Sequence, residues 1–160
     1  MEWNLQLQIV GAVALAMLLG GLIGLERELA DKPAGLRTHM LIAGAAALLT
    51  GGGDLMLRYF SSLPNSNALH ADPLLIIQAI VTGISFLGAG TIIRREAGEQ
   101  IEGLTTAASI LFSAALGICV ALRLLALAAS ATILALVVLR GVASIENWAS
   151  RRRGNHNRKE

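Results

Sequence analysis

The chain has 160 residues, of which 54% are hydrophobic and only 15% are charged, and its mean hydropathy is +0.63. Soluble domains carry about 25% charged residues, and a water-soluble fold of this length would still expose about a third of its surface. The composition therefore excludes an ordinary soluble domain and predicts an all-α membrane protein, a compact bundle of about five transmembrane helices.

Neither the basic pI nor the single cysteine indicates another class of protein. The pI is near 9.2 and the net charge +2, but six of the thirteen Lys and Arg residues follow residue 139, and the chain has one Tyr. Basic residues interleaved with aromatic ones, which binding of single-stranded nucleic acid requires, are missing from this sequence. Cys119 lies in an apolar run, so an intramolecular disulfide and a CxxC metal site are both excluded.

Five apolar segments predict the membrane spans, because a helix needs about 20 apolar residues to cross the hydrocarbon core, with a range of roughly 17–25. In chain order they are Leu5–Leu25, Thr38–Arg58, Leu74–Ile93, Leu104–Leu122 and Leu124–Ile145. The second is apolar only as far as Gly53 and reaches span length if the helix continues towards Phe60. Asp72 and Pro73 resemble an N-cap followed by proline at the first helical position.

The connections between spans are divided by charge. Eleven Lys and Arg lie in 26–37, 94–103 and 140–160, whereas the opposite connections hold two, Arg58 and Arg123. The positive-inside rule then places the amino terminus outside and the carboxyl end in the cytoplasm. We divide the chain into a transmembrane domain at residues 1–145 and a basic cytoplasmic tail at 146–160. Segments Ser61–Ala71 and Arg151–Glu160 are expected to lack regular structure.

Small residues recur at spacings that favour close helix packing. Gly20 and Gly24 form a GxxxG pair late in the first span. A second stripe repeats every four residues on one face of the fourth span: Ser109, Ser113, Gly117 and Ala121. Such stripes let helix backbones approach closely. Packing inside the bundle is the favoured interpretation, and a homodimer surface is the alternative.

The third span holds three glycines between Gly83 and Gly90. Each glycine weakens a helix by about 1 kcal/mol relative to alanine. A close-packed helix is favoured here over a locally unwound segment that lines a cavity, which membranes tolerate only where the backbone is buried in protein or faces water.

Polar residues gather at the predicted cytoplasmic helix ends. Glu26, Arg27 and Glu28 leave the first span, and Arg37, Thr38 and His39 open the second; Thr105 and Thr106, which could cap a helix or bond to a neighbour, open the fourth. Opposite charges at one depth could form a network, and the acidic residues Glu26, Glu28, Asp31, Glu96, Glu99 and Glu102 could attract Mg²⁺. Solvation of charged loops is the favoured interpretation.

Catalysis finds little support, so the chain is predicted not to be an enzyme. Ser85 is followed by Phe86, and the histidines His39 and His70 lie outside the fourth and fifth spans, which leaves the serine without an obvious base. The sequence contains no HExxH, P-loop or dinucleotide-binding motif.

Several stretches together resemble the MgtC/SapB family of bacterial inner-membrane proteins. They follow the family's order over roughly residues 20–120: Gly24-Leu-Glu-Arg-Glu28, Ala34-Gly-Leu-Arg-Thr-His39, Asp72-Pro73, Gly83 through Gly90, and Gly103-Leu-Thr-Thr-Ala-Ala108. The chain departs from the family pattern at Leu75, where an arginine is usual, at Gln78, which stands one place early, and at Ser85, where a glycine is usual. The resemblance implies a five-span domain, and the chain is similar to the short, membrane-only members.

The resemblance carries an expectation of function and of the residues that serve it. It implies functional roles for Glu26, Arg27, Glu28, Arg37, Thr38, His39, Asp72, Gly83, Phe86, Gly88, Gly90, Gly103, Thr105 and Thr106. Family members are associated with growth in low magnesium, with bacterial virulence and with modulation of the membrane ATP synthase. We therefore expect a regulator of other membrane proteins in the inner membrane, with ATP synthase or Mg²⁺ transporters as candidate partners. The alternative is a transporter or channel for Mg²⁺ or another small ion. No cofactor is expected, and a bound Mg²⁺ is left open.

Overall fold

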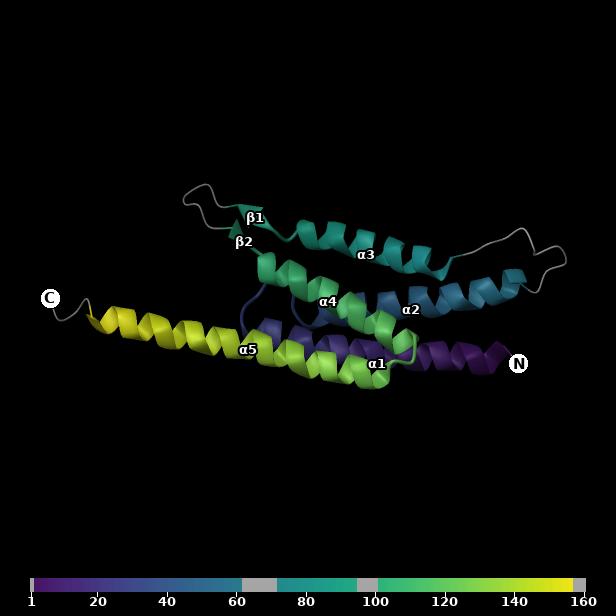
Figure 1. Cartoon of the computed structure of the whole chain (residues 1–160), viewed down its shortest axis with the longest axis horizontal. Helices are drawn as coiled ribbons and strands as arrows, with labels where there is room; N and C mark the ends of the chain where they lie inside the picture. Colours follow the sequence, from purple (N-terminus) through teal and green to yellow (C-terminus); the bar gives the residue numbers. More distant parts are fainter. Residues whose placement is uncertain (1, 62–71, 95–100, 157–160) are drawn as a thin grey trace.

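The computed structural model describes residues 2–61, 72–94 and 101–156, which form a bundle of five helices and one short hairpin (Figure 1). The elements are α1 (Glu2–Leu29), α2 (Leu36–Ser61), α3 (Pro73–Ala89), β1 (Ile93–Arg94), β2 (Ile101–Glu102), α4 (Leu104–Ala121) and α5 (Leu125–His156). The predicted all-α bundle is confirmed. The segment expected to be irregular, Ser61–Ala71, lies outside the described residues except for Ser61, which ends α2.

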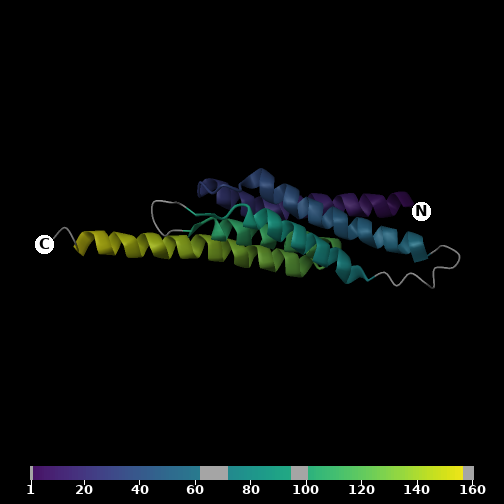
Figure 2. The same ribbon diagram turned by 90° about the horizontal axis from the view of Figure 1, so that it is seen from above.

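Three helices form the centre of the bundle, because α1, α2 and α4 all pack against one another. Helix α3 lies on α4 and α2, and α5 lies along α1 and α4 (Figures 1 and 2). The interior is built mainly from alanine and aliphatic side chains: Ala16, Ile23, Ala43, Ala47, Leu116, Val120 and Ala128 in one cluster, and Ile42, Ala46, Ile80, Ile110, Ala114 and Ile118 in the other. Large apolar side chains, including Leu18, Leu48 and Val137, cover the outside.

The predicted continuation of the second helix is confirmed, since α2 has 26 residues and continues past Asp54 and Arg58. Helices α1, α2 and α4 are each long and apolar enough to cross a membrane. The 17 residues of α3 and the apolar part of α5, Leu125–Gly141, are shorter. Helices of that length stand at the lower end of the range for a span, roughly 17–25 residues.

The structure corrects two predicted helix ends. Helix α3 ends at Ala89 instead of Ile93, and the chain then pairs Ile93 with Glu102 in an antiparallel hairpin. The backbone turns where glycines flank Ala89, a composition that weakens the last helical turn. Gly103 ends the hairpin at φ 93°, a left-handed conformation that favours glycine, and a side chain there would collide with the carbonyl of Thr91.

The second correction concerns the carboxyl end, where structure continues beyond the predicted span. Helix α5 runs to His156, whereas the sequence indicated a helix ending near Ile145 and no stable structure from Arg151 onward. Ala149 and the three arginines Arg151–Arg153 are good helix formers and favour its continuation. Residues 157–160 lie outside the described part.

Helix ends are fixed by local hydrogen bonds. The carboxylate of Asp72 accepts the amide N–H of Leu74 at 2.9 Å, with Pro73 at the first helical position, which confirms the predicted N-cap of α3. Helices α1 and α4 both end in a Schellman motif. In this motif two backbone N–H groups, at and after a left-handed residue, donate hydrogen bonds to carbonyls of the last helical turn. The left-handed residues are Asp31, with φ 53°, and Arg123, with φ 64°.

Close contact between α1 and α2 depends on glycine. A Cβ atom built on Gly20 would lie 2.5 Å from the carbonyl oxygen of His39 and 2.7 Å from the Cβ of Ala43. A Cβ on Gly24 would lie 2.7 Å from the Cα of Leu36. Atoms in proteins do not approach this closely, so any side chain at either position must push the two backbones apart.

We predict that Gly20→Ala lowers the melting temperature of the detergent-purified protein, because the added methyl group forces α1 away from α2. The matched control is Gly11→Ala in the same helix, where a Cβ meets no atom within 4 Å. That change should leave the protein unchanged or stabilise it by up to about 1 kcal/mol through higher helix propensity. Equal melting temperatures for the two variants would contradict the close contact at Gly20.

Candidate functional site

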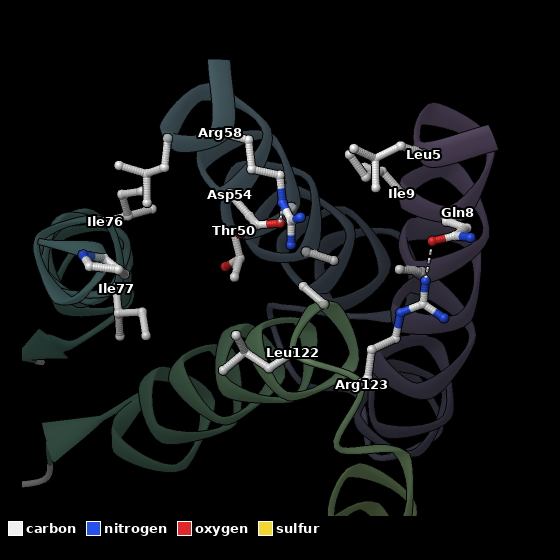
Figure 3. Close-up of a pocket in the computed structure, with 16 residues that line it drawn as sticks. Leu5, Gln8, Ile9, Thr50, Asp54, Arg58, Ile76, Ile77, Leu122 and Arg123 are labelled. Atoms are coloured by element: carbon white, nitrogen blue, oxygen red, sulfur yellow. Dashed lines mark hydrogen bonds and ion pairs between the residues drawn. The ribbon is translucent and has the colours of Figure 1, made fainter. Parts of the chain in front are cut away.

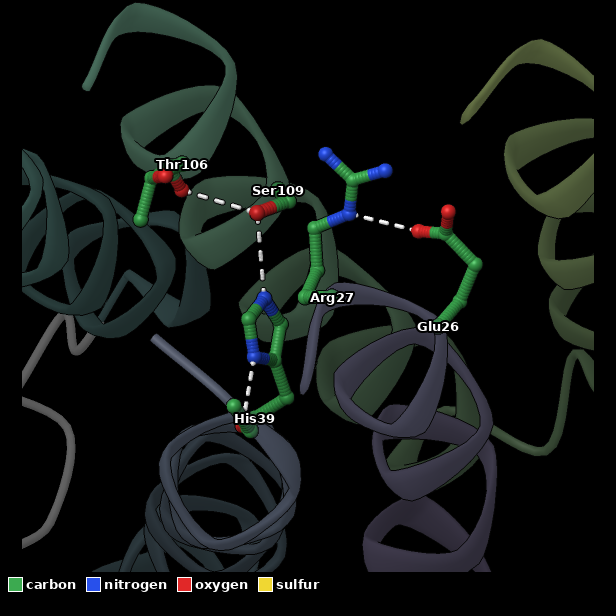
Figure 4. Close-up of polar contacts among 6 residues, drawn as sticks. Glu26, Arg27, His39, Thr106 and Ser109 are labelled. Carbon is green, nitrogen blue, oxygen red and sulfur yellow. Dashed lines mark hydrogen bonds and ion pairs between the residues drawn. The ribbon is translucent and has the colours of Figure 1, made fainter. Parts of the chain in front are cut away.

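A buried group of polar side chains lies where α1, α2 and α4 meet. We name it the polar cluster: Glu26, Arg27, His39, Thr106 and Ser109 (Figure 4). Helix α1 supplies the first two residues close to its carboxyl end, α2 supplies His39 in its first turn, and α4 supplies the last two in its first two turns. All five are buried, so the cluster is part of the bundle interior.

His39 connects α2 to α4. Its ring is fully buried, with Nδ1 2.9 Å from the carbonyl oxygen of Gly35 and Nε2 3.0 Å from Oγ of Ser109. A carbonyl can only accept, so Nδ1 carries a proton and donates it to Gly35. In a neutral ring Nε2 is then the acceptor and takes the hydroxyl proton of Ser109.

The hydroxyl of Ser109 has a second acceptor within reach, the carbonyl oxygen of Thr106 at 2.8 Å. It has one proton and can satisfy only one acceptor at a time. With a neutral His39 ring that proton is shared between Nε2 and the carbonyl of Thr106. With a doubly protonated ring, Nε2 donates to Ser109 and the hydroxyl donates to Thr106. The site thus has two hydrogen-bond arrangements that differ by one proton.

Glu26 and Arg27 form a buried ion pair beside the histidine. Nε of Arg27 lies 2.5 Å from Oε2 of Glu26, and only 5% of Glu26 and 4% of Arg27 is exposed. The sequence favoured solvated charges here, and that interpretation is wrong for both residues. A buried charge is tolerated when an opposite charge lies beside it. Here Arg27 directly follows Glu26 in the chain and pairs with it.

The remaining predicted residues near this end lie outside the cluster. The carboxylate of Glu28 accepts the amide N–H of Leu36 at 2.8 Å and so caps α2 from a different helix. Arg37 and Thr105 are exposed and Thr38 is half-buried. Of the two roles left open for Thr105 and Thr106, the structure does not have the first, because the N-cap of α4 is Gly103 and no side chain caps the helix.

The predicted residues of α3 are distributed over two faces. Gly88 is buried, and a Cβ there would lie 3.5 Å from the carbonyl oxygen of Ala107 in α4. Gly83 and Phe86 point away from the rest of the chain: Phe86 is 84% exposed and a Cβ on Gly83 meets nothing within 4 Å. The segment is helical as far as Ala89, so the structure does not have the unwound alternative. Gly90 is exposed, and Asp72 caps α3 at its other end.

The small-residue stripe of α4 lies inside the bundle. Ser109, Ser113 and Gly117 are buried, and a side chain on Gly117 would collide with the carbonyl of Ala43 in α2. Ala121 is half-buried. The stripe therefore packs inside the bundle and does not form a free surface. Sequence spacing marked Ser109 for packing but gave no signal that it bonds His39, since the two residues are 70 positions apart.

The chemistry available to the polar cluster is limited, because its charged side chains already pair with each other. Over the residues whose placement is described, no three His, Cys, Asp or Glu side chains come close enough to hold a metal ion. The buried carboxylate of Glu26 is already engaged by Arg27. Mg²⁺ prefers carboxylate and water oxygens, so a cation here would first have to displace the guanidinium. What remains is a hydrogen bond that joins α2 to α4 and can redistribute one proton, with a buried ion pair of α1 beside it.

An apolar exterior around a bundle of spanning length, with a charged pair inside it, defines a multi-pass helical membrane protein. The comparisons narrow this class. The sequence profile of the MgtC family matches residues 13–148, and the chain belongs to that family.

Its relatives include "Protein MgtC" of Brucella abortus, 37% identical over 157 residues, which cover 96% of this chain and 60% of the relative. "Protein SapB" of Bacillus subtilis is 36% identical over 118 residues, or 74% of this chain and 49% of the relative. "Putative magnesium transporter YhiD" of Escherichia coli K12 is 37% identical over 126 residues, or 78% and 56%. The chain thus spans about half to three-fifths of the length of these relatives. No solved structure gives a significant match.

We predict that breaking the buried ion pair is far more damaging than breaking an exposed one. Glu26→Gln or Arg27→Gln leaves one charge buried without its partner, which should destabilise the protein by about 3–5 kcal/mol. The control is the exposed i,i+4 pair of Asp54 and Arg58, where Arg58→Gln should cause a loss under about 1 kcal/mol. Thermal unfolding in detergent measures both, and similar losses would show that Glu26 and Arg27 are hydrated.

Proposed function

We propose that this chain is a regulatory protein of the bacterial inner membrane, which acts by binding other membrane proteins during magnesium limitation or related stress, including virulence in pathogens. Family membership supports the setting, since relatives carry the names MgtC, SapB and magnesium transporter. ATP synthase and Mg²⁺ transporters are the candidate partners that the family resemblance implies.

The outward face of α3 is the observation that carries the proposal. It comprises Thr82, Gly83, Ser85 and Phe86, all of them exposed. The hydroxyl of Thr82 donates to the carbonyl of Gln78 at 2.8 Å, so the face presents few unsatisfied polar groups. Helix association in lipid depends on small residues that permit close approach, and Gly83 has open space in front of it. A neighbouring helix could therefore rest on Gly83, with the Phe86 ring beside it.

A Mg²⁺ transporter is the second candidate, and the printed name of the Escherichia coli relative favours it. Ionisable residues inside a membrane bundle often belong to an ion pathway, and Glu26, Arg27 and His39 are such residues. Their pairing argues against this role. The acid is neutralised by a neighbouring guanidinium, and the ring nitrogens of His39 are committed to Gly35 and Ser109.

We place the connection between α1 and α2, the hairpin and the carboxyl end of α5 in the cytoplasm. These parts lie at one end of the bundle, and the amino terminus of α1 lies towards the other (Figures 1 and 2). The positive-inside rule supports this orientation because the basic connections share that end. A second copy of this chain is one of the partners that the outward face of α3 could bind, which would form a homodimer.

Photo-crosslinking from α3 tests the regulatory role. We predict that p-benzoylphenylalanine in place of Phe86 forms adducts with another membrane protein in native membranes. The matched control is the same substitution at Phe112, a partly exposed phenylalanine of α4. Adducts with a second copy of this chain would identify the homodimer. Adducts with lipid alone at both positions, or Mg²⁺ flux through the purified protein in liposomes that Glu26→Gln abolishes, would contradict regulation.

Cysteine labelling tests the orientation. With Cys119→Ser as background, a membrane-impermeant maleimide should label Trp3→Cys in intact spheroplasts and Lys32→Cys only after lysis, since both positions are exposed at opposite ends of α1. The reverse pattern would show that the basic connections face outward.

A further inference from the structure

A pocket of about 360 Å³ opens at the end of the bundle opposite the polar cluster (Figure 3). Its walls come from the first half of α1, the second half of α2, the beginning of α3 and the turn after α4. The volume lies within the range of ligand sites, about 300–1,000 Å³. Of the residues discussed above as predicted sites, Ala121 alone lines it.

The pocket has an apolar interior and a polar rim. Leu5, Ile9, Leu57, Ile76 and Ile77 are among the apolar residues of the wall. Gln8, Asp54, Arg58 and Arg123 supply the charged and amide groups around it. A site of this composition fits a molecule with an apolar part and an anionic head.

The charge of the rim is positive. Arg58 pairs with Asp54 at 2.8 Å within α2, so these two charges cancel. Arg123 instead donates from Nη2 to the amide oxygen of Gln8 at 2.7 Å, a neutral partner on α1 (Figure 3). Among the residues that line the pocket, Arg123 is thus the cation without an acidic partner, and its guanidinium is suited to a phosphate group.

The backbone at Arg123 gives a second, independent reason to single out this residue. Arg123 occupies the left-handed position of the Schellman motif that ends α4, with φ 64°. Glycine is the residue that this position favours, because a side chain is strained there. The chain therefore keeps an arginine at the pocket rim against the local preference of the backbone.

The position of the pocket relative to the membrane surface indicates the source of the anionic group. Trp3, 77% exposed, begins α1, and Tyr59, 62% exposed, lies one residue beyond Arg58 on α2. Tryptophan and tyrosine favour the membrane–water interface at the level of the lipid headgroups. The rim therefore lies at the depth of the lipid phosphates, and the apolar wall extends towards the acyl chains.

We propose that this pocket binds an anionic phospholipid, with the phosphate at Arg123 and the beginning of an acyl chain against Ile9 and Ile77. This inference is independent of the regulatory role argued above. It assigns the outer end of the bundle a lipid site, and it explains why the α4–α5 turn carries arginine.

Lipid binding to the full chain in a neutral detergent, counted by native mass spectrometry, tests the site. Phosphatidylglycerol should bind in preference to phosphatidylcholine, and Arg123→Gln should weaken phosphatidylglycerol binding by roughly tenfold, the order expected for one charge-assisted hydrogen bond. Arg123→Lys should retain much of the preference. Lys32→Gln, which removes an exposed charge at the other end of α1, is the control and should change nothing.

A second variant separates binding from folding. Arg123→Gly removes the guanidinium but suits the left-handed backbone, so it should melt no lower than the parent while losing the lipid preference. Equal binding of the two lipids by the parent would overturn the proposal. Equal losses of phosphatidylglycerol binding in Arg123→Gln and Lys32→Gln would also overturn it, because they would indicate an effect of overall charge. Inorganic phosphate that competes as well as phosphatidylglycerol does would overturn it too, because it would indicate a site for free anions.

Discussion

The close approach of α1 and α2 at Gly20 and Gly24 is the constraint on which the rest of the structure depends. Between apolar helices in lipid the hydrophobic effect supplies no attraction, so association relies on packing at short range. Both glycines face the first turns of α2, and Gly20 lies against the carbonyl of His39 itself. The contact that joins the two helices therefore also fixes the backbone of the histidine that reaches α4.

The polar cluster follows from this contact. With α1 and α2 held together, Arg27 and Glu26 are enclosed by the bundle and must pair, and the ring of His39 lies within reach of Ser109. Buried polar groups are costly unless they are satisfied, and most of the interactions here are made within the cluster or to adjacent backbone. The two ends of the bundle consequently differ. One encloses polar side chains from three helices, and the other is open at a pocket whose rim is basic.

Much of the fold could be predicted from the sequence, because hydropathy and loop charge are local properties. They gave the helical class, the number of helices and the extension of α2, and the Asp72-Pro73 pair gave the N-cap of α3. The hairpin after α3 and the continuation of α5 to His156 could not be read in the same way. A two-residue strand carries no periodicity, and a helix rich in charged and polar residues differs little in composition from an irregular tail.

The candidate site was predicted in part, and the remainder depends on tertiary structure. Sequence resemblance marked Glu26, Arg27 and His39, but their burial depends on how α4 covers α1 and α2. The bond from His39 to Ser109 joins residues far apart in the chain, so no spacing rule could reveal it. Arg123 drew attention only as a loop charge, because its strained backbone and its place at a pocket rim emerge once the turn is folded.

Nitrogen NMR of ring-labelled histidine is the most direct measurement of whether the bundle encloses a self-satisfied polar cluster. A background of His70→Gln and His156→Gln leaves His39 as the one histidine. The account predicts a protonated Nδ1 in slow exchange with water, a resonance that Ser109→Ala changes and that added Mg²⁺ does not. A rapidly exchanging ring, or one whose resonances shift on titration with Mg²⁺, would show a hydrated cation path in place of the closed cluster.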